Sequence, residues 1–205
     1  MSATNRGSTI VSQEFYPTPK ATTMSILKEI DFTKVNSFLE PCRGENHIFE
    51  LVNVPNKSYC EISEGIDYLT TKLDRFDLIL TNPPFSLAQQ FITKARTESD
   101  TVVMLQRINY LGSSARKKFW DQNPPTHLFV LANRPKFIAK CTNKAKTKTG
   151  KKVCKDTNSY QISNQDTCCL TCGSKVAPAS DATEYAWFVW DTAGVITKPP
   201  GIYVI

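Results

Sequence analysis

The sequence predicts an open, doubly wound α/β sheet with a small insertion before its last strand. Three observations support this prediction. Short apolar runs typical of strands alternate with segments of helical periodicity, which favours parallel strands joined by helices. The run at 76–82 is nearly continuously apolar, as in a strand buried on both faces. A stretch rich in Cys and Lys at 138–180 separates the last strand-like run from the others.

The first part of the chain begins with a polar arm at 1–14, which we expect to be flexible. Two prolines and a helical pattern follow at 15–30. Residues 35–52 predict a strand, a turn containing Gly44 and the start of a helix. Two further short strands are expected, at 58–62 and 65–69.

The second part continues the alternation. A helix is expected at 86–98, where Leu87, Phe91 and Ile92 share one face and Ser86 is the expected N-cap. Another helix is expected at 113–122 and ends before a pair of prolines. Strands are expected at 76–82, 101–107, 126–132 and 184–191. The predicted main domain therefore comprises 15–137 and 181–205, with 138–180 inserted.

The charge of the chain is concentrated in one block. The net charge of the 205 residues is +6, and the stretch from Arg134 to Lys155 holds nine Lys or Arg with no Asp or Glu. Such a block favours a polyanionic partner over a small neutral ligand. A solvated, flexible loop is the alternative interpretation.

The apolar runs are strand-sized and too short to span a bilayer, and the first residues lack the apolar core of a signal peptide. We therefore expect a cytoplasmic protein, of a bacterium or of an infected cell, with no membrane partner.

The end of the run at 76–82 carries the most informative motif, Asn82-Pro83-Pro84-Phe85. Prolines restrict the backbone and remove N–H donors, so the Asn82 side-chain oxygen and the Pro83 carbonyl can face one small region. Two convergent acceptors suit an exocyclic amino group, which has two hydrogens to donate. Phe85 offers a face on which a flat ring can stack. A turn that merely ends a strand is the alternative, but it would need neither the Asn nor the Phe.

Three acidic positions precede this motif. In a doubly wound sheet, ligands bind outside the carboxyl ends of the strands, where Glu40 and Glu61 are expected. Gly44 would let the backbone approach a ligand, and Asn46 suits a left-handed turn position. Glu61 could accept hydrogen bonds from ribose hydroxyls, and Asp67 from an adenine amino group.

These motifs together resemble the S-adenosylmethionine-dependent amino-methyltransferases of the class I, Rossmann-like fold. They resemble in particular the small phage-type DNA N6-adenine methyltransferases. Asn82–Phe85 looks like their catalytic D/N/S-P-P-Y/F/W motif, and residues 40–46 are similar to their cofactor loop, D/E-P-x-x-G-x-G, with Asn46 in place of the second Gly. Residues 16–19 resemble the N-terminal cofactor motif. The resemblance implies cofactor-binding positions at Tyr16, Thr18, Glu40, Pro41, Cys42, Gly44, Asn46, Glu61, Asp67 and Asn82.

The resemblance also implies direct methyl transfer to the N6 amino group of adenine in DNA, after the base is flipped out of the duplex. Catalytic roles are implied for Asn82, Pro83, Pro84 and Phe85. Three alternatives remain: adenine-N6 methylation of RNA, N-methylation of protein glutamine, and a catalytically silent binding protein that kept the fold.

The insertion contains Cys169-x-x-Cys172-Gly173, the pattern of a zinc knuckle. Cys141 and Cys154 could complete a structural site of four thiolates, with Cys168 as a spare or a substitute for Cys169. A set of free thiols is the alternative. The expected nucleic-acid contacts are Arg134, Lys136, Lys140, Lys144, Lys146, Lys148, Lys151 and Lys152. The sequence does not decide between a monomer and a dimer.

Overall fold

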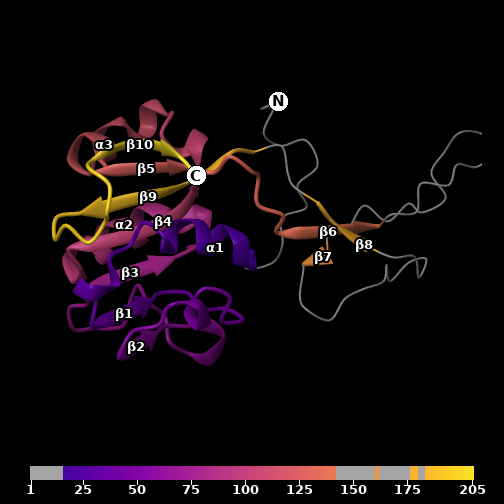
Figure 1. Ribbon diagram of the computed structural model, residues 1–205. Helices are drawn as coiled ribbons and strands as arrows, with labels where there is room; N and C mark the ends of the chain where they lie inside the picture. Colours follow the sequence, from indigo (N-terminus) through magenta and orange to yellow (C-terminus); the bar gives the residue numbers. More distant parts are fainter. Residues whose placement is uncertain (1–15, 142–159, 162–175, 180–182) are drawn as a thin grey trace, which may run out of the picture.

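The computed structural model describes residues 16–141, 160–161, 176–179 and 183–205, with side chains for 16–137 and 183–205. The fold is built on a seven-stranded sheet of order β10-β5-β9-β4-β3-β1-β2 (Figure 1). Four neighbouring strands are parallel, and they are β2 (Asn56–Tyr59), β1 (Ser37–Glu40), β3 (Leu78–Thr81) and β4 (Thr101–Arg107). This arrangement confirms the predicted open α/β sheet.

The other side of the sheet departs from the prediction in two respects. The expected last strand, β9 (Tyr185–Asp191), runs antiparallel between β4 and β5 (His127–Val130), although strict alternation predicted parallel pairing. A further strand, β10 (Gly201–Val204), pairs with β5 at the edge of the sheet (Figure 1). Val130 at the end of β5 pairs with Ala186 near the start of β9, so β9 enters the sheet at the end where β5 leaves it.

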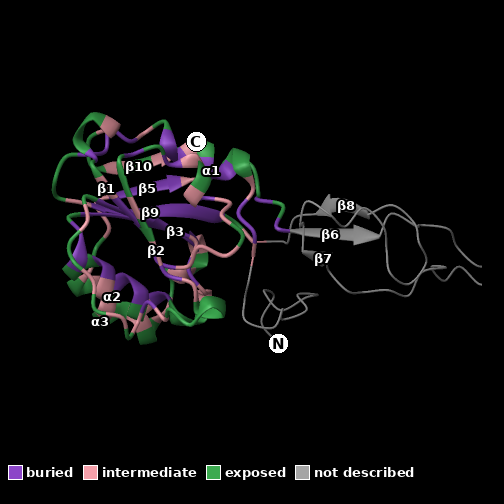
Figure 2. Ribbon diagram, turned by 90° about the horizontal axis from the view of Figure 1, so that it is seen from below, coloured by how far each residue is buried: buried purple, intermediate pink, exposed green. Residues whose placement is uncertain are grey.

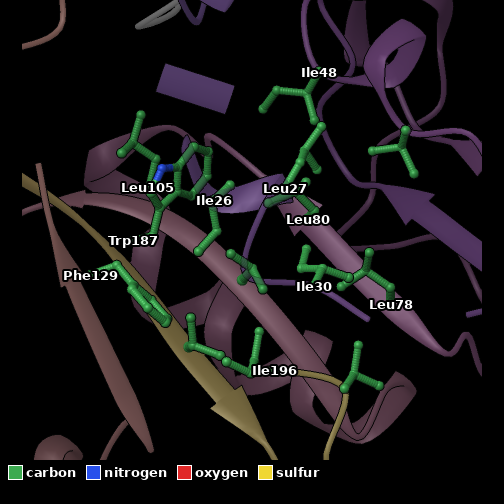
Figure 3. Packing of buried hydrophobic residues seen from close by; sticks show 14 of the residues in the cluster. Ile26, Leu27, Ile30, Ile48, Leu78, Leu80, Leu105, Phe129, Trp187 and Ile196 are labelled. Atoms are coloured by element: carbon green, nitrogen blue, oxygen red, sulfur yellow. The ribbon is translucent and has the colours of Figure 1, made fainter. Parts of the chain in front are cut away.

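Helices cover both faces of the sheet. α1 (Lys20–Leu27) packs Ile26 and Leu27 against Leu78 and Leu105 on one face, and Trp187 completes this cluster (Figure 3). The opposite face is covered by α2 (Ala88–Glu98) and α3 (Lys117–Gln122), which lie together on that side of the sheet (Figure 2). Alternate residues of β4 thus face different clusters, as expected for a strand buried on both faces.

The helix expected after the Gly44 turn is reduced to one 3₁₀ turn, η4 (Phe49–Leu51). The chain then becomes extended at Val52, and Val52 and Val54 are buried. A proline disfavours helical geometry in the residue before it, and Pro55 follows Val54. The prediction of a helix there was wrong because burial of the two valines and the proline favour an extended chain.

The strand expected at 65–69 is also absent, and residues 67–71 form a turn instead. The Asp67 carbonyl accepts the backbone N–H groups of Thr70 and Thr71, and its carboxylate accepts that of Leu69. An Asp that bonds the backbone two residues on stabilises a turn rather than a strand. The only regular element between β2 and this turn is η5 (Ile62–Glu64), which ends at Gly65 in the left-handed region.

The start of α2 differs slightly from the prediction. The NPPF motif is followed by a 3₁₀ turn, η6 (Phe85–Leu87), and α2 begins at Ala88 with Leu87, not Ser86, in the N-cap position. The Pro84 carbonyl accepts the Leu87 N–H and so begins the turn directly after the prolines. The remaining short turns are η3 (Phe32–Lys34), η7 (Ile108–Tyr110) and η8 (Ser114–Arg116).

A second, antiparallel sheet of order β7-β6-β8 is formed by residues between β5 and β9. Its strands are β6 (Ile138–Cys141), β7 (Tyr160–Gln161) and β8 (Val176–Ala179). Within the described part of the chain, no helix is long and apolar enough to cross a membrane.

Candidate active site

The candidate site lies at the carboxyl edge of the parallel strands. Glu40 ends β1, Asn82 follows β3 directly and Arg107 ends β4. The segment before α1 reaches this edge, because Tyr16 and Thr18 contact Asn82. Residues far apart in the sequence are thereby brought to the place where such sheets bind ligands.

The orientation of the Asn82 side chain is determined by its partners. Its amide nitrogen donates to the Tyr16 carbonyl oxygen and to the Thr18 hydroxyl, both at 3.1 Å. A carbonyl oxygen can only accept, so the nitrogen must face Tyr16 and the oxygen must point the other way. That oxygen, Oδ1, is buried and has no hydrogen-bond partner among the described residues. The site thus holds an oriented acceptor to which no described residue donates.

Phe85 lies among other rings. Its centroid is 6.0 Å from that of Tyr16 in a stacked pair, and 5.9 Å from that of Tyr185. The guanidinium carbon of Arg107 lies 4.7 Å from the ring centroid, and Phe137 contacts both Tyr16 and Tyr185. A partly buried aromatic cluster therefore includes Tyr16, whose carbonyl oxygen accepts from the Asn82 amide nitrogen.

Sequence reasoning missed Arg107, Phe137 and Tyr185 as members of this site. A signal existed for two of them, because Arg107 ends a predicted strand at the carboxyl edge and Tyr185 begins the next strand in the sheet. The two residues are direct partners in the β4–β9 register. Without the antiparallel direction of β9, however, Tyr185 would have been placed at the opposite edge.

Glu40 is buried in the candidate cofactor loop, with a relative exposure of 2%. Burial raises the pKa of its carboxyl well above the ordinary value, and this effect exceeds the opposing effects of the Phe49 backbone N–H and of the Arg43 and Lys57 charges. Its Oε2 atom has no partner in the described part of the chain. Glu40 is therefore a second buried acceptor with unused capacity.

The loop after β1 has the backbone geometry expected of a tight turn. Gly44 and Asn46 both have positive φ angles, 52° and 67°, in the left-handed region. This confirms the interpretation of Asn46 as a residue that can take the place of a glycine at such a position. The loop can therefore turn twice within three residues.

Glu61 ties this loop to the segment after β2. Its Oε2 accepts the Gly44 N–H at 2.7 Å, and its Oε1 accepts the backbone N–H and the hydroxyl of Ser63 at 3.0 and 2.7 Å. Burial alone would raise its pKa, but the hydrogen bonds from Ser63 and Gly44 and the charge of Arg43 lower it below the ordinary value. Glu61 is thus an ionised group that the loop already uses.

Arg43 and Cys42 make further links. The Arg43 guanidinium lies 3.8 Å from the Tyr59 ring centroid and forms an ion pair with Glu64. The Cys42 sulfur lies 2.8 Å from the Thr81 hydroxyl and 3.4 Å from the Asn82 carbonyl, and burial raises the pKa of this thiol. Cys42 is therefore a neutral thiol that joins the two candidate motifs.

The remaining predicted residues are placed as follows. Pro41 and Pro83 are buried, while Asp67 is half-buried and bonds Leu69 through one carboxylate oxygen. Arg134 pairs with Glu184, with 2.8 Å between Nε and Oε1, and Lys136 is exposed. Cys154, Cys169, Cys172 and the Cys141 side chain lie outside the described residues, as do the Lys140 side chain and Lys144, Lys146, Lys148, Lys151 and Lys152. Among the side chains of 16–137 and 183–205, no group of three or more His, Cys, Asp or Glu could hold a metal ion.

Two solved structures resemble this fold. One is a "putative RNA methyltransferase" from Pyrococcus horikoshii, which is 14% identical over 87% of each chain with a TM-score of 0.54. This likeness shows that the two proteins share a fold. The fold is that of the class I methyltransferases. The other is a "putative class I S-adenosylmethionine-dependent methyltransferase" from Listeria monocytogenes, with 14% identity, a TM-score of 0.48, and coverage of 91% of this chain and 64% of the other. No protein-family model and no curated protein matches the sequence.

Proposed function

We propose that the chain transfers a methyl group from S-adenosylmethionine to the N6 amino group of adenine in DNA. The observation that carries this proposal is the Asn82 side chain. Its amide nitrogen is held by Tyr16 and Thr18, which leaves Oδ1 buried, oriented and without a partner in the described chain. A buried acceptor of this kind is costly to maintain unless a ligand donates to it.

The residues of the neighbouring loop fit the cofactor. Glu40 keeps a buried acceptor unused, and Gly44 and Asn46 shape a turn that a ligand can approach. S-adenosylmethionine supplies a methyl group on a positively charged sulfur, and a site with several acidic groups suits that charge. Its binding is assigned to Glu40, Gly44, Asn46, Glu61 and Asp67, with Tyr16 and Thr18 at the border to Asn82.

The chain's own contribution to the reaction is alignment. Asn82 Oδ1 accepts one hydrogen of the substrate amino group and the Pro83 carbonyl accepts the other, which directs the nitrogen lone pair at the methyl carbon. The nitrogen–carbon bond forms as the carbon–sulfur bond breaks, and the amino group then loses one proton to solvent. Alignment of this kind can lower a barrier by about 7–11 kcal/mol. The two fixed acceptors also stabilise the positive charge that develops on nitrogen.

Phe85 supplies the surface for the base. Tyr16, Tyr185 and Arg107 surround this ring, so a flat ligand that reaches Asn82 contacts an aromatic wall. A base in a duplex must leave the stack to reach such a position. The basic block from Arg134 to Lys155 supports nucleic acid over protein as the substrate, because it favours a polyanion.

The substrate is tested by supplying labelled S-adenosylmethionine with duplex DNA, single-stranded DNA, RNA and a glutamine-containing protein. We expect label in DNA, recovered as N6-methyladenine after digestion to nucleosides. Label only in RNA or only in protein would replace the DNA assignment by one of the two alternatives. Cofactor binding without transfer to any acceptor would favour a silent binding protein.

A second experiment uses DNA from cells that express the chain. Long-read sequencing should detect modified adenines and report their sequence context. Their absence in cells expressing the wild-type chain, together with label in RNA in the purified assay, would contradict the DNA proposal.

A further inference from the structure

The connection from 107 to 118 runs from the end of β4 to the start of α3. It carries basic side chains whose part in substrate binding the proposed function does not specify. The stretch 101–120 contains four basic residues, Arg107, Arg116, Lys117 and Lys118, and no Asp or Glu. The connection 107–118 starts at the carboxyl end of β4, which is the edge where Asn82 lies. A positive segment therefore begins beside the candidate active site and lies outside the basic insertion.

Contacts hold this connection against Phe85 of the NPPF motif, the start of α2 and the residue before β9. The Arg107 guanidinium lies over Phe85, and the Tyr110 phenol oxygen lies against the backbone N–H of Gln89 in the first turn of α2. The Ile108 N–H donates to the Glu184 carbonyl at 3.0 Å. The connection is thus bonded to the first turn of α2 and to the residue before β9.

The basic side chains of the connection differ in how far their charge is compensated. Lys117 pairs with Asp121 at 2.7 Å. Arg116 donates through Nε to the Tyr110 carbonyl at 2.8 Å and lies 4.4 Å from the Tyr110 ring centroid. Among the described residues, neither Arg116 nor Lys118 forms an ion pair with a carboxylate. The Arg116 guanidinium is therefore oriented by neutral partners and keeps its full charge.

We propose that the connection 107–118 is a nucleic-acid contact surface of the methyltransferase domain. Arg107 contacts the target nucleotide beside Phe85, and Arg116 and Lys118 contact backbone phosphates of the flanking nucleotides. The inference rests on the proposed function, because the nucleotide at Arg107 is the methyl acceptor. A guanidinium both stacks on a flat ring and pairs with phosphate, which suits this position.

The phosphate contacts are tested by the double variant Arg116→Gln/Lys118→Gln in the full chain. The matched control is Lys72→Gln/Arg75→Gln, which removes the same charges from exposed residues before β3, at the amino edge of the sheet. Binding to a labelled DNA duplex is measured by fluorescence anisotropy at several salt concentrations. We expect the Kd of the double variant to rise about 10-fold at 0.1 M salt. The slope of log K against log salt should fall by about 2 relative to the control.

Two further variants separate charge from folding. Arg116→Lys keeps the charge and should keep the wild-type slope. Lys118→Gln alters an exposed side chain, so it should fold normally and lower the slope by about 1. A double variant that folds, as judged by circular dichroism, and binds DNA like the control would overturn the inference.

The Arg107 contact is tested separately by methyl transfer. Arg107→Gln should lower kcat/KM for DNA at least about 5-fold and leave the Kd for S-adenosylmethionine unchanged. Arg107→Lys should not fully restore transfer, because an ammonium has no planar face. Wild-type transfer by Arg107→Gln would overturn this part. If the wild-type chain methylates no nucleic acid but the binding differences persist, the proposed function fails while the contact surface stands.

Discussion

The carboxyl edge of the sheet has two halves that use their polar groups differently. The half that we propose binds the cofactor, called the cofactor half, comprises the loops after β1 and β2. Its Glu61 and Arg43 side chains are bonded within it, while buried Glu40 keeps one oxygen without a partner among the described residues. Glu61 accepts hydrogen bonds from Gly44 and Ser63, and Arg43 pairs with Glu64. The target half comprises the segments after β3 and β4. There a neutral amide, Asn82, is held from one side, and its buried oxygen has no partner in the described part of the chain.

This difference indicates that one half contributes to cofactor affinity and the other to the rate of methyl transfer. A ligand in the cofactor half competes with bonds that the loop already makes, so changes there should appear in cofactor affinity. The target half holds an acceptor that Tyr16 and Thr18 already orient, so changes there should appear in the rate of transfer. Preorganised groups of this type account for much of catalysis.

Glu61→Ala should have the largest effect in the cofactor half. Hydrogen bonds to a charged group contribute about 1.5–3 kcal/mol, so the Kd for S-adenosylmethionine should rise about 10- to 150-fold. At saturating cofactor, kcat should stay within a few-fold of wild type. Calorimetry and initial rates measure both quantities, and Ser63→Ala, which keeps the carboxylate, is the matched control. A fall in kcat with unchanged affinity for S-adenosylmethionine would mean that Glu61 acts in methyl transfer and not in cofactor binding.

Phe85→Leu tests the aromatic wall of the target half. Leucine preserves packing but removes the face for stacking, which is worth about 1–3 kcal/mol per base. We expect kcat/KM for DNA to fall about 5- to 150-fold with unchanged cofactor affinity, whereas Phe85→Tyr should keep activity. Equal rates for the Leu and Tyr variants would show that the base does not stack on this residue.

Glu40→Gln tests the buried acid of the cofactor half by its pH dependence. The pKa of Glu40 is higher in the folded than in the unfolded chain, so the folded chain binds more protons between the two values. Stability without cofactor should therefore fall as pH rises through this window. Glu40→Gln should remove this dependence and stabilise the protein by about 1–3 kcal/mol above the window. Thermal unfolding from pH 4 to 9 measures it, and parallel curves would contradict the assignment.

Gln106→Met should have the smallest effect. Gln106 is fully buried and neither amide atom has a partner among the described residues. By strand alternation it faces the side of Met104 and α2, away from Arg107 and Phe85. We expect a gain in stability of about 1 kcal/mol, because burial of an amide without partners costs free energy, and unchanged methyl transfer, because Gln106 faces away from Phe85. Loss of transfer in this variant would mean that the target half extends to the α2 face.

The sequence predicted the parallel half of the sheet well because the relevant signals are local. The apolar run before Asn82 and the polar residues at strand ends indicate both the strands and the site. The position of Asn46 followed from its tolerance of positive φ, which the backbone confirms.

The sequence predicted the antiparallel half less well. The direction of β9 depends on where the chain re-enters the sheet after the insertion, which no local pattern in 184–191 encodes. Tyr185 and Arg107 could not be placed together without that direction. The turn at Asp67 was missed for another reason, since apolar residues around an Asp also match a short strand.

The most direct test of the role of Asn82 compares methyl transfer by the wild-type chain with that by Asn82→Ala, at saturating S-adenosylmethionine and DNA. We expect Asn82→Ala to lose transfer by a factor of at least about 100, as when a preorganised hydrogen-bonding group is removed from other active sites. Its affinity for S-adenosylmethionine should stay within about threefold of wild type, and Asn53→Ala, on an exposed loop before β2, should leave both unchanged. Transfer by Asn82→Ala at the wild-type rate would show that Asn82 does not align the amino group.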